Sequence, residues 1–187
     1  MRIISGIHKG RKIMTPKNLP VRPTTNRAKE GLFNILNNII DFNSIDVLDL
    51  FSGTGSISFE FSSRGVKNVI SIDKSFNCIK HIKKVSNELN LAITPIKSEV
   101  LSYLKKPKKK FNIIFADPPY EWNNENYVKM IKLIFENYWL VPGGKLIIEH
   151  DKKTIISSKI KSPFSKQYGD NVFSFYKKKQ VDKPDSV

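Results

Sequence analysis

Short apolar runs that alternate with helical stretches constrain the fold of this chain more than any other feature. The runs are β-branched or aromatic and almost continuously hydrophobic, as strands of a buried parallel sheet are. They lie at residues 45–51, 68–73, 93–97, 111–116 and 145–149. Helical patterns occupy residues 56–64, 75–89, 99–104 and 124–139. This alternation predicts an open, doubly wound α/β sheet, whose ligands bind at the carboxyl ends of the strands.

The first 25 residues form a separate pattern. Short apolar and basic runs are interrupted by Ser5-Gly6 and Lys9-Gly10, which predicts a small basic hairpin or arm at residues 1–25. Apolar residues then recur at helical spacing, with Thr25 or Asn26 available as the N-cap.

The end of the chain predicts a closing hairpin at residues 164–176, around Gly169-Asp170. Residues 181–187 read as a disordered tail. We therefore expect one main domain at residues 26–180, preceded by the arm.

The chain of 187 residues is strongly basic, with 32 Lys and Arg against 17 Asp and Glu and a formal charge of +15. Such an excess favours polyanions, above all nucleic acid, because each neutralised phosphate releases counterions. Only five of the basic residues are Arg, and Ile and Asn are abundant, as an AT-rich genome would also produce. Charge alone therefore leaves nucleic-acid binding open.

Cysteine content and hydropathy indicate the compartment. Cys78 is the lone cysteine, so no intrachain disulfide can form. Residues 1–12 are polar and basic, unlike a signal peptide, and no apolar run is long enough to span a bilayer. We expect a cytoplasmic protein without a membrane partner. The three histidines lack metal-ligand spacing, so we expect no metal site.

A glycine loop follows the first central strand. Gly53 and Gly55 lie between that strand and a helix, where they let a ligand approach the backbone, although a structural tight turn would also explain them. A dinucleotide fingerprint would place glycine where Ser58 stands, and the Asp49 carboxylate would repel a pyrophosphate. The same carboxylate suits S-adenosylmethionine, which carries an ammonium and a sulfonium. The loop thus favours S-adenosylmethionine and disfavours a nicotinamide oxidoreductase.

Acidic residues after the next two strands complete a candidate cofactor site. Asp73 lies 18 residues beyond Gly55, close to the spacing expected of a ribose-binding carboxylate. The alternative is that Asp73 caps the helix that starts near Ser75. Glu99, beside Val100, is a weaker candidate for the adenine amine, because first-turn dipole compensation explains it almost as well. Phe51 is a candidate to line the pocket.

Asp117-Pro118-Pro119-Tyr120 ends the fourth strand and is the sharpest motif in the chain. Two prolines stiffen the loop. The Asp117 side chain and the Pro118 carbonyl can accept both hydrogens of an exocyclic base amine, aiming its nitrogen at a methyl donor. Tyr120 offers a ring on which a flipped base can stack. A surface turn is the alternative for the motif taken alone.

These motifs together resemble a known family. The chain resembles the S-adenosylmethionine-dependent amino-methyltransferases in three places: Asp49–Gly55, Asp73 and Asp117–Tyr120. The N-terminal part and the end of the chain narrow the likeness to RsmD, the bacterial 16S rRNA guanine-N2 methyltransferase family. The residues that carry it are Arg2–Gly6, Gly10–Lys12, Arg22–Arg27, Glu30, Leu32, Phe33, Trp139, Leu140, Gly143, Gly144, Glu149, Lys166, Gly169 and Tyr176. Ser5, Ile7-His8 and Glu99 depart from the family pattern.

The resemblance implies a Rossmann-like class I methyltransferase fold, with a seven-stranded, mostly parallel sheet flanked by helices and a small N-terminal hairpin. It also implies transfer of a methyl group to N2 of a guanine in 16S rRNA, within an assembling small ribosomal subunit. A monomer is adequate for this activity.

The resemblance places RNA contacts in the N-terminal part, where Arg11, Lys12, Arg22 and Arg27 lie. Arg suits phosphates and base edges, and its use here in a Lys-rich chain supports such contacts; pairing of Arg27 with Glu30 is the alternative. The Lys-rich loop at residues 105–110 reads as mostly solvated.

Two other functions remain open at this point. Asp-Pro-Pro-Tyr also occurs in DNA adenine-N6 and cytosine-N4 methyltransferases, although 187 residues leave little room for a target-recognition region. A noncatalytic RNA-binding ribosome assembly factor would keep the fold, but the intact motif at Asp117–Tyr120 argues against it.

Overall fold

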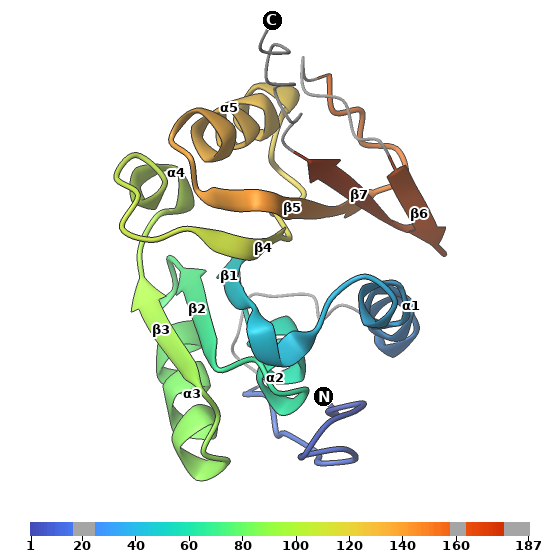
Figure 1. Ribbon diagram of the computed structural model, residues 1–187, viewed down its shortest axis with the longest axis vertical. Helices are drawn as coiled ribbons and strands as arrows, with labels where there is room; N and C mark the ends of the chain where they lie inside the picture. The colour runs from blue at the N-terminus through green and yellow to red at the C-terminus, as the bar shows by residue number, and fades with distance from the viewer. Residues whose placement is uncertain (17–24, 158–163, 178–187) are drawn as a thin grey trace, which may run out of the picture.

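A computed structural model describes residues 1–16, 25–157 and 164–177 (Figure 1). Its centre is a seven-stranded sheet with the order β3-β2-β1-β4-β5-β7-β6. The strands are β1 Asp46–Leu50, β2 Asn68–Asp73, β3 Ile93–Lys97, β4 Phe111–Ala116, β5 Leu140–Asp151, β6 Phe164–Tyr168 and β7 Asn171–Lys177. β1 to β5 are parallel, and β7 and β6 add an antiparallel edge. The predicted doubly wound, mostly parallel α/β fold is confirmed.

Helices cover both faces of the sheet (Figure 1). They are α1 Asn26–Asn37, α2 Ser56–Ser63, α3 Phe76–Glu88, α4 Val100–Tyr103 and α5 Asn124–Glu136, with a 3-10 turn η1 at Phe42–Ser44. Alternate residues of β1 feed the two layers: Leu48 and Leu50 pack with α4 and α5, and Val47 packs with α1 and α2. Both layers are apolar cores, as a sheet buried on two sides requires.

The sequence placed most element boundaries within one or two residues, with two larger differences. β5 starts at Leu140, five residues before the predicted strand, because the chain keeps pairing through a register shift opposite Phe111. α5 ends at Glu136, before the predicted 139, because Tyr138 has a φ of 57° and Trp139 turns into the core. Of the two predicted caps for α1, Thr25 is the one observed, with Oγ1 3.2 Å from the Ala28 amide.

The N-terminal arm packs against α2. Its two sides meet through a bridge between Arg2 and Lys12, and the Ile7 amide donates to the Ser63 carbonyl at 2.8 Å. At Gly6, where φ is 85°, an added Cβ would lie 1.8 Å from that same carbonyl oxygen, so only glycine fits. The predicted limits of the arm, the main domain and the tail at residues 181–187 involve residues outside the described ranges and stay predictions.

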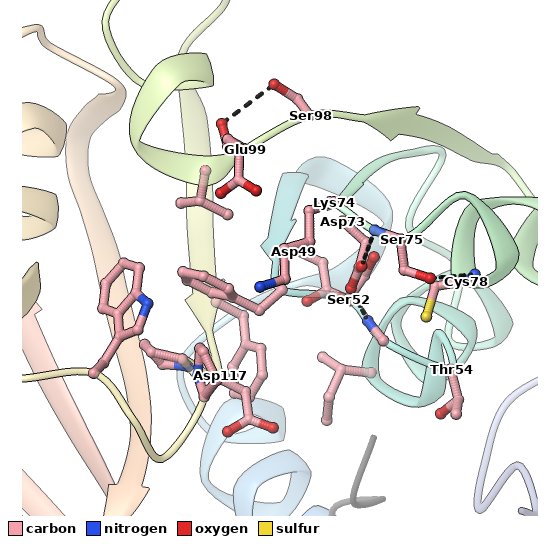
Figure 2. Close-up of a pocket in the computed structure, with 18 of the residues that line it drawn as sticks. Asp49, Ser52, Thr54, Asp73, Lys74, Ser75, Cys78, Ser98, Glu99 and Asp117 are labelled. Carbon is pink, nitrogen blue, oxygen red and sulfur yellow. Dashed lines mark hydrogen bonds between the residues drawn. The ribbon is translucent and has the colours of Figure 1, made fainter. Parts of the chain in front are cut away.

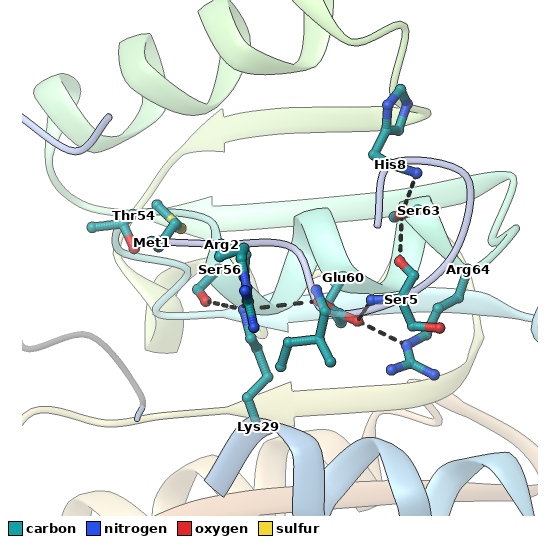
Figure 3. A network of polar contacts seen from close by, with 11 residues as sticks. Met1, Arg2, Ser5, His8, Lys29, Thr54, Ser56, Glu60, Ser63 and Arg64 are labelled. Atoms are coloured by element: carbon teal, nitrogen blue, oxygen red, sulfur yellow. Dashed lines mark hydrogen bonds and ion pairs between the residues drawn. The ribbon is translucent and has the colours of Figure 1, made fainter. Parts of the chain in front are cut away.

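A buried carboxylate on α2 ties the arm to the domain (Figure 3). Glu60 is fully buried and accepts hydrogen bonds from the amides of Ile4 and Ser5, at 2.8 and 3.0 Å, and from Arg64 Nε at 3.0 Å. Lys29 Nζ lies 3.8 Å from Glu60 and donates to the Arg2 carbonyl and to Ser56 Oγ. Because Ser56 is the first residue of α2, one network joins the arm to the segment that follows the glycine loop.

Within the described ranges, no helix is both long enough and apolar enough to cross a membrane.

Candidate active site

A cavity of about 420 Å³ lies at the carboxyl ends of β1, β2 and β4 (Figure 2). This is the edge where an α/β sheet binds its ligands. The predicted site residues that line it are Asp49, Phe51, Gly53, Asp73, Glu99, Val100, Asp117, Pro118, Pro119 and Tyr120. Residues far apart in the sequence therefore meet in a single pocket.

The glycine loop connects β1 to α2 beneath this cavity. The Gly53 amide donates to Asp73 Oδ2 at 2.8 Å, so the loop is held to the end of β2. Gly55 is the N-cap of α2 with a φ of 82°, and an added Cβ would lie 2.8 Å from both Ile82 and Phe59. Gly55 shapes the turn from below and does not itself line the cavity. The tight packing beneath the loop brings its backbone close to any ligand above.

Asp73 is oriented from two sides. Its second oxygen accepts from the Ser75 amide at 2.8 Å. The N-cap of α3 is Ser75, whose Oγ accepts a hydrogen bond from the Cys78 amide. The alternative role of Asp73, as the cap of this helix, is therefore wrong. A carboxylate has about four lone-pair sites, and two backbone bonds leave acceptor capacity for the hydroxyls of a ribose.

Asp49 is a buried carboxylate with few local partners. It is 1% exposed and accepts from Ser58 Oγ at 2.5 Å. Burial is the main cause that raises the pKa of Asp49 to about 7; hydrogen bonding to Ser58 opposes this rise, and the charges of Asp73 and Glu149 contribute to it. A cation in the cavity would stabilise the ionised form. Ser58, which excluded a dinucleotide fingerprint, thus orients this carboxylate.

Two aromatic rings and an acidic residue form the wall near β4 and α4. Phe51 has a φ of 61°, a conformation that residues with a Cβ rarely adopt and that is often found at functional sites. Its ring packs edge-on against Trp122 at 4.8 Å between centroids. Glu99 is the N-cap residue of α4 but makes no side-chain cap hydrogen bond, and Figure 2 shows its carboxylate beside the pocket. Glu99 and Val100 therefore stay the proposed adenine-side residues.

The Asp117–Tyr120 loop closes the cavity at the end of β4. The Trp122 amide donates to the Pro119 carbonyl at 2.9 Å, which fixes a tight turn. Burial raises the pKa of the Asp117 carboxyl well above its ordinary value, and the charges of Glu149 and Asp49 add to this effect. Tyr120 is 66% exposed at the mouth. The loop thus presents a carboxyl group inside the cavity and an aromatic ring at its entrance.

A second, smaller cavity of about 30 Å³ adjoins the first. Both are lined by Asp117, Pro118 and Tyr120. The smaller one extends toward the ends of β5 and β7, where Glu149 and Asn171 lie.

The predicted RNA-binding residues lie away from these cavities. Arg11, Lys12 and Arg27 are exposed and none lines either cavity; Arg22 lies outside the described residues. The ion pairs of the described segments do not include one between Arg27 and Glu30. In the Lys-rich loop, Lys109 pairs with Asp46 at 2.8 Å.

Several lining residues were not among the site residues predicted from the sequence. They are Ser52, Thr54, Ser56, Ile57, Lys74, Ser75, Cys78, Ser98, Phe115, Glu121 and Trp122. Most directly adjoin a predicted site residue, so their position next to a strand end is the signal that finds them. Within the described segments, no group of three or more His, Cys, Asp or Glu side chains is arranged to hold a metal ion.

Fold and site together define an S-adenosylmethionine-dependent methyltransferase. Solved structures agree: a putative methyltransferase from Escherichia coli has a TM-score of 0.79 at 26% identity, covering 94% of this chain and 96% of that one. A putative methylase from Haemophilus influenzae has a TM-score of 0.73 at 29% identity, with the same coverage of both chains.

Sequence comparison gives the family. The model of the family described as Conserved hypothetical protein 95 matches residues 1–177. Ribosomal RNA small subunit methyltransferase D of Haemophilus influenzae is 35% identical over 81% of this chain and 79% of its own length, and that of Escherichia coli is 31% identical over 81% and 75%. The chain belongs to this family of ribosomal RNA small subunit methyltransferase D, RsmD. The resemblance read from the sequence is confirmed.

Proposed function

We propose that the protein transfers a methyl group from S-adenosylmethionine to the exocyclic N2 of a guanine in 16S rRNA. The observation that carries this proposal is the position of Asp117. Asp117 lines the larger cavity together with Asp49 and Asp73, and it also lines the smaller one. One side chain therefore lies where a methyl donor and a base would meet.

The residues of the larger cavity fit S-adenosylmethionine. Two carboxylates, Asp49 and Asp73, line this cavity and would face the positive charge and the ribose hydroxyls of the donor, and the packing under Gly55 would keep the loop backbone close to it. When bound, the donor supplies a methyl group activated by an adjacent sulfonium. In this proposal Glu99 and Val100 contact the adenine and Phe51 packs beside it.

The Asp117–Tyr120 loop would position the acceptor. The Asp117 side chain and the Pro118 carbonyl accept the two amine hydrogens, which directs the nitrogen lone pair toward the methyl carbon. As the nitrogen–carbon bond forms, the carbon–sulfur bond breaks and positive charge develops on the nitrogen beside Asp117. The ionised Asp117 carboxylate, whose pKa is raised by burial, is then a suitable acceptor for the amine proton. Pro119 holds the turn, and Tyr120 stacks on the flipped base.

We place the RNA backbone along the arm and α1. Arg11, Lys12 and Arg27 are exposed cations there, and Arg22 lies between them in the sequence. Contacts of this kind position an RNA without reading its sequence. We further propose that a monomer acts on 16S rRNA within an assembling small subunit.

Labelled S-adenosylmethionine tests this function. Small ribosomal subunits lacking the modification, naked 16S rRNA and duplex DNA serve as acceptors, and the product is identified by nucleoside mass spectrometry. The proposal predicts N2-methylguanosine in the rRNA, with the higher rate on the particle. Methylated adenine or cytosine in DNA would show the DNA enzyme instead, and cofactor binding without transfer would show a noncatalytic assembly factor.

A further inference from the structure

A second buried carboxylate stands beside Asp117. Ala116, the last residue of β4, pairs with Ile148 of β5 in the parallel register, so Asp117 and Glu149 come next on neighbouring strands, which lie about 4.8 Å apart. Both line the smaller cavity, and the charge of Glu149 raises the pKa of Asp117. Two acidic side chains therefore share the place where the amine of the base is proposed to bind.

Glu149 is held in a defined orientation. It is 4% exposed, and its Oε1 accepts from Asn171 Nδ2, at the first residue of β7. A carboxylate only accepts hydrogen bonds, so the group that it faces in the cavity has to donate.

Bases that carry an exocyclic amine differ in the ring atom next to that amine. In guanine, the carbon that bears N2 lies between N1, which bears a hydrogen and donates, and N3, which has a lone pair; only N1 can donate. In adenine and cytosine, the corresponding ring nitrogen has a lone pair and accepts. A carboxylate that faces this atom attracts guanine and repels the other two bases, because buried polar groups are strongly selective for a matching partner.

We propose that Glu149 selects guanine by accepting the N1 hydrogen of the flipped base, while Asp117 holds its N2 amine. The inference rests on the proposed function and adds the residue that determines its base specificity. It also gives a reason, independent of the Asp-Pro-Pro-Tyr motif, for a guanine product.

The test compares two acceptors that differ at this ring nitrogen. 2-Aminopurine keeps the exocyclic 2-amine of guanine but has a lone pair at N1 and lacks the 6-oxygen; only the contribution of N1 should depend on Glu149. Small-subunit RNA is prepared with either guanine or 2-aminopurine at the methylated position, and kcat/KM is measured for each at pH 8. Wild type is expected to prefer guanine by at least about fivefold, since a well-matched contact to a base discriminates against the wrong base by roughly 1–3 kcal/mol. In Glu149→Gln, the side-chain amide can either donate to or accept from the ring nitrogen. The preference for guanine is therefore expected to fall below about threefold.

A matched control and a second variant keep the test decisive. Glu136→Gln removes an exposed carboxylate on α5 that pairs with Lys132, and it should leave the preference unchanged. Asn171→Ala removes the hydrogen bond that orients Glu149, and its preference for guanine should lie between those of wild type and Glu149→Gln. If Glu149→Gln fails to bind S-adenosylmethionine, the preference of Asn171→Ala tests the inference in its place.

Two results would overturn the inference. One is a Glu149→Gln enzyme that loses activity on both acceptors equally, which would mean that Glu149 acts only through Asp117. The other is a wild-type enzyme that methylates both acceptors at the same rate. Failure of the proposed function itself is separate, because wild type would then not methylate guanine in rRNA at all.

Discussion

The pKa of Asp49 makes the affinity for S-adenosylmethionine depend on pH near neutrality. Burial raises this pKa to about 7 in the free protein, whereas a cationic ligand favours the ionised carboxylate. Binding then lowers the pKa and releases a proton, so affinity increases as pH rises through 7 and levels off above it. Half of the Asp49 carboxyls are ionised at pH 7 and roughly 3% at pH 5.5, which predicts roughly fifteenfold weaker binding, or about 1.6 kcal/mol.

Isothermal titration calorimetry at pH 5.5, 6, 6.5 and 7 measures this dependence, and buffers of different ionisation enthalpy report the released proton. Asp49→Asn keeps the shape of the side chain and an oxygen for Ser58, and it should remove most of the slope. The pH dependence of affinity that remains in this variant reports the titration of the ligand and of the other groups of the protein. Asp117→Asn should keep the slope, because Asp117 is proposed to face the amine of the base. Wild-type affinity that is flat from pH 5.5 to 7, or an equal slope in Asp49→Asn, would refute the reasoning.

Three further variants test other parts of the account. Glu60→Gln puts an amide where three donors converge and should lower the free energy of unfolding by about 3–5 kcal/mol, whereas the exposed Glu88→Gln should change it by less than about 0.5 kcal/mol; urea denaturation compares them, and equal losses would contradict a buried anchor. Gly55→Ala should lower the free energy of unfolding by at least about 1–2 kcal/mol, because the positive φ alone costs roughly this much; urea denaturation that shows wild-type stability would contradict the close packing under the loop. Tyr120→Ala should raise KM for the RNA about tenfold, since one stacking contact is worth roughly 1–3 kcal/mol; steady-state kinetics check this, with Tyr120→Phe as the control that keeps the ring.

The sheet and the cofactor side of the site could be predicted because both follow local rules. Continuous apolar runs mark buried parallel strands, and residues directly after those strands meet at one edge. Asp49, Asp73 and Asp117 were found in this way, and all three line the cavity. The order of the strands brings together residues that lie up to 68 positions apart in the sequence, as Asp49 and Asp117 do.

The remaining features depend on tertiary contacts that carry no local signal. Lys29 and Glu60 look like exposed helix residues in the sequence, yet both are buried because the arm folds over α2. Trp139 is the last residue of a predicted helix, but in the structure it follows the end of α5. Its side chain is buried, and its Nε1 donates to the Leu104 carbonyl at 2.9 Å. The small cavity beside Glu149 includes Asn171, which lies opposite Asp151 in the antiparallel pairing of β7 with β5. Such pairings form between distant segments, and no periodicity predicts them.

Asp117→Ala tests the central claim most directly, because the account places Asp117 between the methyl donor and the base. S-Adenosylmethionine affinity and single-turnover transfer to small ribosomal subunits are measured on the same preparation. The account predicts affinity close to that of wild type and no detectable N2-methylguanosine. Normal transfer by the variant would remove Asp117 from the mechanism and contradict the account.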